Sequence, residues 1–185
     1  MPGVEGRVAL VTGAGRGIGR VTADLLASRG ARVMAVARSE NELQTLGLDY
    51  IVADLGTADG CTLAVEETQD RLGPVEILVC NHGIGSAHER VIWEQEPELW
   101  RETMRINLDG PYFLSRLVVK DMIEQGYGRL VFTSSTAGQV AEYAGSAYNS
   151  SKHGLLGLMR SVAQDAGPHS VTSNAVLPGW VRTPM

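Results

Sequence analysis

A tyrosine and a lysine near the end of the chain have the types and the spacing for acid–base chemistry. Tyr148 and Lys152 are four residues apart, so on a helix their side chains share one face and meet. A lysine ammonium favours the phenolate and lowers the pKa of a tyrosine from its usual value of about 10. Ser135 stands thirteen residues before Tyr148, and its hydroxyl reaches the same place if the chain between them loops back. The pair therefore indicates a general acid or base, with a chance meeting on a helix as the alternative.

A cluster of glycines stands between the first predicted strand and the first predicted helix. Residues 7–12 form a short apolar run that predicts a buried strand, and the segment GAGRGIG follows at residues 13–19. Glycines at such a turn let the backbone approach a pyrophosphate and direct helix N-terminal N–H groups at the anion. The pattern therefore predicts a phosphate-binding turn, although a tight strand–helix turn without a ligand has the same glycines.

The end of the second predicted strand, residues 32–37, indicates which dinucleotide is preferred. Arg38 and Ser39 follow this strand, and no acidic residue occurs between the end of the strand and Glu40. An acid at this position binds the 2′-hydroxyl of the adenosine ribose, whereas an arginine accommodates a 2′-phosphate. Arg38 and Ser39, with Arg16 from the glycine turn, suit the phosphate. The sequence therefore favours NADP(H) over NAD(H), with surface arginines that bind nothing as the alternative.

Strands and helices alternate along the rest of the chain. Further strands are predicted at 50–53, 76–80, 128–134 and 171–176, and further helices at 39–47, 57–72, 96–125 and 147–167. This alternation predicts an α/β fold, a Rossmann-like doubly wound parallel sheet of at least six strands in the order 3-2-1-4-5-6 with helices on both faces. Ligands bind outside the carboxyl ends of such strands, so the glycine turn, Asn81, Ser135 and Pro178 are expected to converge there.

Two polar residues in this pattern have two interpretations each. Asp54 follows the third predicted strand, where its carboxylate can accept a hydrogen bond from the adenine amino group or can begin a helix. Asn107 lies in the long predicted helix shortly before Pro111, which interrupts helical hydrogen bonding. Asn107 can hold a water with the freed backbone groups, or it can be a core asparagine that satisfies its own backbone.

Composition excludes several classes of protein. The chain has 185 residues, 44% of them hydrophobic, which is enough for one domain with a substantial core. A net charge of −5 without any basic run disfavours nucleic-acid binding. No apolar run is long enough for a membrane span, and the N-terminus has no secretory signal pattern. The four histidines lack metal-ligand spacing, so no metal site is expected, and Cys61 and Cys80 indicate reduced, buried thiols and the cytoplasm.

Taken together, these segments resemble the short-chain dehydrogenase/reductase family over residues 7–185. The matching motifs are TGAGRGIG at 12–19, NHG at 81–83, Asn107, SSTAG at 134–138, YNSSK at 148–152 and PGWVRT at 178–183. His82 departs from the family, which usually has alanine there, and we expect it to affect cofactor packing rather than chemistry. The members that the chain resembles include carbonyl and 3-oxoacyl reductases that prefer NADP.

The resemblance implies a role for each motif. Four catalytic residues are implied: Asn107, Ser135, Tyr148 and Lys152. Ser135 would polarise a carbonyl oxygen and Tyr148 would protonate it, while Lys152 would lower the pKa of Tyr148 and bind the nicotinamide ribose. Asn107 would hold the water that returns protons through Lys152. The residues implied to bind the cofactor are Gly13, Gly15, Arg16, Gly17, Ile18, Gly19, Arg38, Ser39, Asp54, Leu55, Asn81, Gly83, Tyr148, Lys152, Pro178, Gly179, Val181 and Thr183.

The expected function is therefore the NADP(H)-dependent interconversion of a ketone or aldehyde and an alcohol. An NAD-dependent alcohol dehydrogenase of the same fold, with Glu40 or solvent at the ribose, is one alternative. A non-catalytic dinucleotide-binding sensor or scaffold is the other. The substrate pocket is expected to be formed by residues 84–95, residues 136–145 and Trp180, a mixture that suits a mid-sized, partly apolar carbonyl compound or alcohol. Sugar, keto-ester, acyl and steroid substrates all remain open.

The sequence carries three further expectations, on assembly, on domain organisation and on chain length. The helix at 147–167 is apolar enough to pack against a second copy, so a homodimer or homotetramer is expected. Residues 1–185 are expected to form a single dinucleotide-binding and catalytic domain. Family members normally continue past the position of Thr183 with a substrate lid and a last strand, which this chain lacks, so we expect it to be part of a longer protein.

The cofactor assignment generates the first prediction. Arg38→Asp should weaken the binding of NADP by roughly 10–100-fold, because a charged hydrogen bond is lost and a repulsion takes its place. The binding of NAD should change much less. Isothermal titration calorimetry with both dinucleotides measures the difference, and equal weakening of the two would show that Arg38 does not bind the 2′-phosphate.

Overall fold

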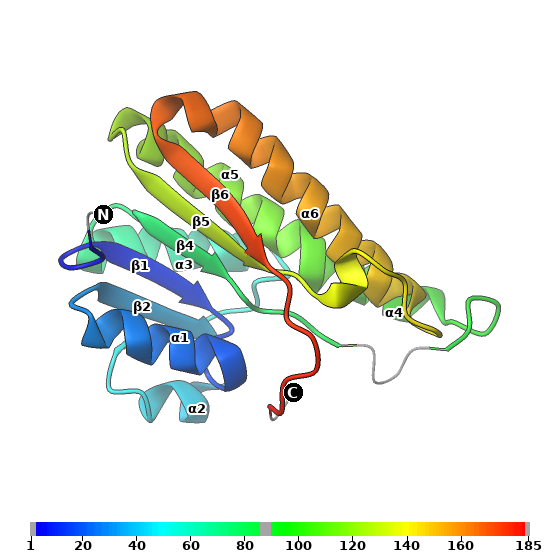
Figure 1. The fold of residues 1–185 in the computed structure, drawn as a ribbon. Coiled ribbons are helices and arrows are strands. Elements are labelled where there is room, and N and C mark those ends of the chain that lie inside the picture. The colour runs from blue at the N-terminus through cyan, green and yellow to red at the C-terminus, as the bar shows by residue number, and fades with distance from the viewer. Residues whose placement is uncertain (1–2, 86–89, 184–185) are drawn as a thin grey trace.

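The central element of the computed structural model, which describes residues 3–85 and 90–183, is a parallel sheet. In this part of the chain six strands pair in the order β3-β2-β1-β4-β5-β6 (Figure 1). The strands are β1 (Val8–Thr12), β2 (Arg32–Ala37), β3 (Asp49–Val52), β4 (Ile77–Cys80), β5 (Gly128–Thr133) and β6 (Val171–Val176). The order reverses direction between β1 and β4, and the predicted fold class and strand order are confirmed.

The position of each strand in the sheet explains its sequence. β1 (VALVT) and β4 (ILVC) are buried along their whole length because alternate residues of these central strands pack in the cores on the two opposite faces of the sheet. Their sequences are accordingly continuous apolar runs instead of an alternation. β5 lies nearer the edge, and its residues alternate between buried and partly exposed, because helices cover only one of its faces.

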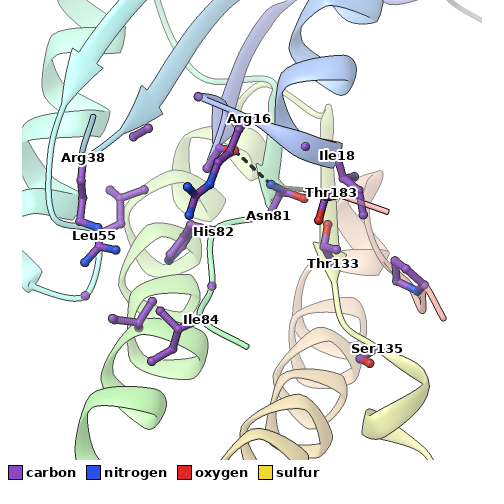
Figure 2. A pocket seen from close by; sticks show the side chains of 18 of the residues that line it. Arg16, Ile18, Arg38, Leu55, Asn81, His82, Ile84, Thr133, Ser135 and Thr183 are labelled. Atoms are coloured by element: carbon purple, nitrogen blue, oxygen red, sulfur yellow. Dashed lines mark hydrogen bonds between the residues drawn. The ribbon is translucent and has the colours of Figure 1, made fainter. Parts of the chain in front are cut away.

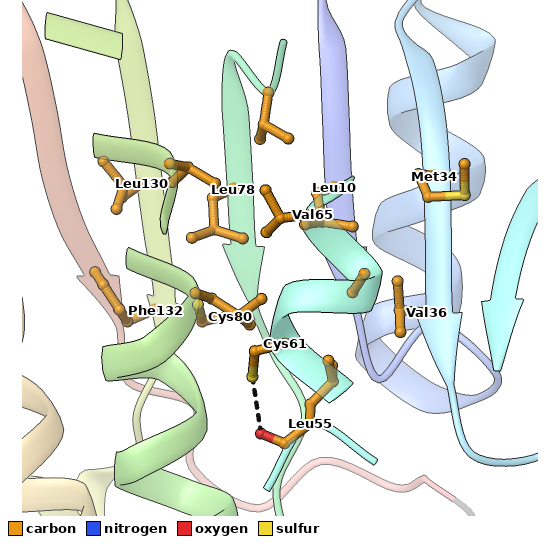
Figure 3. Close-up of a cluster of buried hydrophobic side chains, with 14 of the residues drawn as sticks. Leu10, Met34, Val36, Leu55, Cys61, Val65, Leu78, Cys80, Leu130 and Phe132 are labelled. Atoms are coloured by element: carbon orange, nitrogen blue, oxygen red, sulfur yellow. Dashed lines mark hydrogen bonds between the residues drawn. The ribbon is translucent and has the colours of Figure 1, made fainter. Parts of the chain in front are cut away.

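Helices cover both faces of the sheet. On one face lie α1 (Gly17–Ser28) and the short α2 (Glu40–Gln44), packed on a small core that includes Val11, Val33 and Val79. On the other face lie α3 (Ala58–Leu72), α5 (Gly110–Glu124) and α6 (Ser146–Ala166), which bury the larger core around Leu78 and Phe132 (Figure 3).

The two cysteines belong to this larger core. Cys61 and Cys80 are both buried and free, as the sequence predicts. Burial raises the pKa of the Cys61 thiol to about 12, so the group is protonated at neutral pH. The Cys61 Sγ lies 3.3 Å from the carbonyl oxygen of Leu55 and helps to hold the turn after β3 against α3 (Figure 3).

The long predicted helix at 96–125 is interrupted, as Pro111 led us to expect. It consists of α4 (Pro97–Met104), a π-helical turn η1 (Arg105–Asp109) and α5. Gly110 N–H donates to the carbonyl of Arg105, five residues back. The carbonyl of Ile106 has no such donor, because the residue five positions later is Pro111, which has no N–H. The π turn rotates Asn107 into the interior, where it is fully buried.

No helix in the described ranges is both long enough and apolar enough to cross a lipid bilayer.

Two helical glycines generate the second prediction. A Cβ on Gly110 would collide with the carbonyl oxygen of Leu55, whereas one on Gly157 of α6 would meet no atom within 4 Å. Gly110→Ala should therefore lower the free energy of unfolding by about 1–3 kcal/mol through overpacking. Gly157→Ala should raise it by about 0.5–1 kcal/mol, because alanine is the better helix former. Urea unfolding of the two variants measures both values, and changes of the same sign would contradict the packing described here.

Candidate active site

Loops at the carboxyl ends of all six strands surround one large pocket, of about 630 Å³. Figure 2 shows Arg16 and Arg38 toward one end of it and Ser135 toward the other. All of the residues predicted to be catalytic or to bind the cofactor line this pocket except Gly19 and Asn107. The structure therefore brings together segments that are up to 170 positions apart, from Gly13 to Thr183.

The glycine turn after β1 needs its glycines for close packing. Gly13 has a φ of 63°, in the left-handed region that favours glycine. A Cβ on Gly19 would collide with the carbonyl oxygen of Gly13, so Gly19 supports the turn from behind without lining the pocket. The side chain of Asn81 donates to the carbonyls of Thr12 (3.2 Å) and Gly13 (3.3 Å) and holds the turn against the end of β4 (Figure 2).

The predicted tyrosine–lysine pair lies on the first turns of α6. Lys152 Nζ is 5.6 Å from the centroid of the Tyr148 ring, so the two side chains lie together. The ammonium donates to the carbonyl oxygen of Thr133 at the end of β5, at 2.9 Å. Lys152 is 5% exposed, and this burial lowers its pKa to about 8, because desolvation penalises the charged form. Lys152 is therefore still mostly protonated at neutral pH and places a positive charge beside the phenol, although its pKa is only slightly above neutral.

The segment between Ser135 and Tyr148 loops back, as the proposed chemistry requires. Ser135 precedes a 3₁₀ turn, η2 (Thr136–Gly138), and its hydroxyl oxygen accepts from the N–H of Ala137 at 3.1 Å. The neighbouring Ser134 uses its hydroxyl to donate to the carbonyl of Lys152 at 3.1 Å. Of the two serines, Ser134 is therefore engaged with the α6 backbone, whereas the hydroxyl hydrogen of Ser135 is not used in its bond to Ala137.

Asn107 joins three segments instead of lining the pocket. Its Oδ1 accepts from the N–H of Ile84 at 2.8 Å, and its Nδ2 donates to the carbonyl of Ile84 at 3.0 Å. Nδ2 also lies 3.1 Å from the Ser151 hydroxyl oxygen, next to Lys152 in α6. The side chain thus satisfies backbone groups, but these belong to the loop after β4 and not to Asn107 itself.

Asp54 is held by a residue that sequence reasoning missed. Its Oδ1 accepts from the N–H of Gly56 at 3.0 Å and its Oδ2 from Arg105 Nη1 at 2.8 Å. Partial burial acts to raise the pKa of Asp54, but the hydrogen bonds from Arg105 and Gly56 outweigh it and lower the pKa below its usual value. Arg105 lies on the π turn, 51 positions from Asp54, and no local pattern in the sequence links the two.

His82 packs beside the pocket as a neutral ring. Its Nδ1 lies 2.8 Å from the hydroxyl oxygen of Thr12, and a Cβ on Gly110 would come within 2.7 Å of its Nε2. Desolvation, assisted by the charge of Lys152, lowers the pKa of His82 to about 3. The extra volume relative to alanine is therefore accommodated by a glycine on α5, and the ring is uncharged at neutral pH.

The predicted 2′-phosphate site contains an acid that the sequence did not single out. Arg16, Arg38 and Ser39 line the pocket together, and so does Glu42 of α2. Glu42 Oε1 is 3.7 Å from Arg16 Nη1. Glu40, the acid named for the NAD alternative, accepts a hydrogen bond from the Tyr50 hydroxyl at 3.3 Å and is not among the residues that line the pocket.

The segments expected to bind substrate lie only partly within the described residues. Residues 86–89 of the 84–95 segment, which include His88, lie outside them. Ile92 and Gln95 line a separate hollow of about 120 Å³ with Trp100 and Ser146. Trp180 is 98% exposed between two residues, Gly179 and Val181, that line the main pocket.

The residues present fit a nicotinamide dinucleotide. Gly13, Gly15 and Gly17 of the glycine turn line the pocket, where a pyrophosphate can approach their backbone, and the guanidinium groups of Arg16 and Arg38 line the same pocket. Within residues 3–85 and 90–183 no three His, Cys, Asp or Glu side chains form a group that could hold a metal ion.

This fold and site define the class of protein: the model of the family described as short chain dehydrogenase matches residues 7–185, and the chain belongs to that family of NAD(P)-dependent oxidoreductases. Among its relatives, the chain is 35% identical over 188 residues to 3-oxoacyl-(acyl-carrier-protein) reductase FabG of Escherichia coli, with 98% of this chain and 76% of that protein covered. FabG of Vibrio cholerae is 33% identical over 189 residues, with the same coverage of 98% and 76%.

Solved structures agree with this assignment. A crystal structure of a variant of actinorhodin polyketide ketoreductase with NADPH matches with a TM-score of 0.92 and 35% identity, covering 97% of this chain and 72% of that one. The crystal structure of levodione reductase matches with a TM-score of 0.94 and 31% identity, covering 98% and 74%.

The buried lysine generates the third prediction. Below pH 8 Lys152 is charged in both the folded and the unfolded states. Burying this charge then lowers the free energy of unfolding by its full desolvation cost. Between pH 8 and 10.5 the unfolded state binds more protons, so this cost disappears as the pH rises. Lys152→Met should therefore raise the free energy of unfolding at pH 7 by roughly 1–3 kcal/mol and much less at pH 10.

Urea unfolding at the two pH values measures this difference. Lys120→Met, at an exposed lysine on α5, is the matched control and should show no such pH dependence. A gain for Lys152→Met that is equal at both pH values would show that desolvation of the charge is not its cause.

Proposed function

We propose that the chain catalyses NADP(H)-dependent interconversion of a ketone or aldehyde and the corresponding alcohol. The observation that carries the proposal is that Ser135, Tyr148 and Lys152 line the same pocket as the glycine turn and Arg38. The names of the FabG relatives, and of the ketoreductase solved with NADPH, support a carbonyl substrate and the phosphorylated dinucleotide.

The cofactor would be held by loops that follow the carboxyl ends of the strands. The glycine turn would bind the pyrophosphate, and Arg16, Arg38 and Ser39 the 2′-phosphate. Asp54 and Leu55 would contact the adenine, and the loop at 178–183 the nicotinamide half. When bound, NADPH supplies the hydride that reduces a carbonyl carbon.

The protein groups handle the carbonyl oxygen and its proton. The Ser135 hydroxyl donates a hydrogen bond to that oxygen, and the Tyr148 phenol donates the proton that it takes up. Lys152, fixed by the carbonyl of Thr133, places a positive charge beside the phenolate that remains. The charge stabilises the phenolate and makes the proton easier to give. In the direction of oxidation the Tyr148 phenolate accepts the proton from an alcohol.

Asn107 would contribute by holding neighbouring segments of the site in place. It fixes both backbone groups of Ile84 and lies beside Ser151, so it connects the loop after β4 with the helix that carries Lys152. We propose that a water at this π turn passes protons from solvent through Lys152 to Tyr148. The proposal uses the turn's irregular hydrogen bonding, in which Pro111 leaves the carbonyl of Ile106 without a helical donor.

The fourth prediction tests the role of Tyr148. Tyr148→Phe should lower kcat by roughly 10²–10⁴-fold, because the general acid is lost while the ring is kept. The dissociation constant for NADPH, measured by isothermal titration calorimetry, should change little. Consumption of NADPH and NADH over a panel of ketones, keto-esters and acyl substrates gives kcat and also compares the two dinucleotides.

Tyr112→Phe is the control, since Tyr112 is 48% exposed on α5 and is not one of the pocket-lining residues. Near-normal turnover of Tyr148→Phe would contradict the assigned acid. Binding of NADPH with no hydride transfer to any compound of the panel would favour the sensor or scaffold alternative.

A further inference from the structure

A carboxylate lies where the arginines of the cofactor pocket converge. Glu42 lines the pocket with Arg16 and Arg38, and its Oε1 is 3.7 Å from Arg16 Nη1. Both side chains are accessible, 56% for Arg16 and 36% for Glu42, so a ligand in the pocket can reach either of them. The pocket therefore presents an ion pair and a second guanidinium to the adenosine end of a dinucleotide.

The glycine at position 15 shows that the Glu42 side chain is built into the turn. A Cβ on Gly15 would come within 2.5 Å of Glu42 Oε2 and 3.1 Å of Glu42 Cβ. Gly15 is not among the glycines with positive φ, so its backbone conformation is open to any residue. The space that a side chain at position 15 would take is thus occupied by the carboxylate of Glu42.

The charges here act differently on the two dinucleotides. A phosphate monoester carries close to two negative charges at neutral pH, and Glu42 both repels it and competes with it for Arg16. A 2′-hydroxyl is a hydrogen-bond donor that a carboxylate accepts. Arg38 remains to attract the phosphate, and its positive charge also acts on Asp54 at the end of β3.

We infer that Glu42 determines the specificity of this pocket for NADP(H) relative to NAD(H). Its carboxylate pairs with Arg16, weakens the binding of the 2′-phosphate and accepts a hydrogen bond from the 2′-hydroxyl of NAD. The ratio by which the pocket prefers NADP(H) over NAD(H) is therefore smaller than two unpaired arginines would produce. The inference rests on the proposed function, because it needs a dinucleotide in this pocket.

The fifth prediction is a change in the ratio of two dissociation constants. Glu42→Gln should tighten the binding of NADP by about three- to tenfold, because the repulsion is removed and Arg16 is released. The binding of NAD should stay the same or become weaker. Isothermal titration calorimetry with NADP and NAD measures the ratio without depending on turnover, and the thermal unfolding midpoint confirms that the variant is folded.

Two further variants sharpen the test. Glu40→Gln is the matched control on the same helix, since Glu40 contacts Tyr50 and is not among the residues that line the pocket, and it should leave the ratio unchanged. Glu42→Ala removes the charge together with the packing on Gly15 and should shift the ratio in the same direction as Glu42→Gln. An unchanged ratio in both Glu42 variants, or an equal change in both dissociation constants, would overturn the role of Glu42. Failure of the unmodified protein to bind either dinucleotide would instead overturn the proposed function.

Discussion

The arrangement of the active site depends on one hydrogen bond, from the Lys152 ammonium to the carbonyl of Thr133. It links the first turns of α6 to the carboxyl end of β5, and it holds a charge in a place where burial makes that charge costly. Buried charges persist in proteins when they are hydrogen-bonded. A methionine of similar size would fill the same space without the cost of burying a charge. A lysine at this position is therefore consistent with a chemical role.

The π turn is the second support, and it explains several residues together. Pro111 prevents regular helical hydrogen bonding, the turn of residues 105–109 points Asn107 inward, and Asn107 then binds the backbone of Ile84. Gly110 allows this turn to pack against Leu55 and the ring of His82. The histidine ring at position 82 fits here because Gly110, which it packs against, has no side chain.

At the adenosine end, charge matters more than shape. Arg16 and Arg38 make the pocket positive, Glu42 reduces that potential, and Arg105 holds Asp54 as a carboxylate. Because these groups are partly exposed, each contributes little to stability but can still discriminate between ligands that differ by a phosphate. With the role inferred for Glu42, a small number of partly exposed charges would tune which dinucleotide the protein prefers.

The sequence alone determined the individual strands and helices, the glycine turn, the Tyr148–Lys152 pair and the break at Pro111, because each depends on residues close together in the chain. Apolar runs bounded by glycines reveal strands, and a spacing of four reveals neighbours on a helix. Only the tertiary structure decided the pairs Asp54–Arg105, Arg16–Glu42, His82–Gly110 and Asn107–Ile84. Their members lie on different elements, and which of them meet depends on how helices pack on the sheet, which no local pattern records.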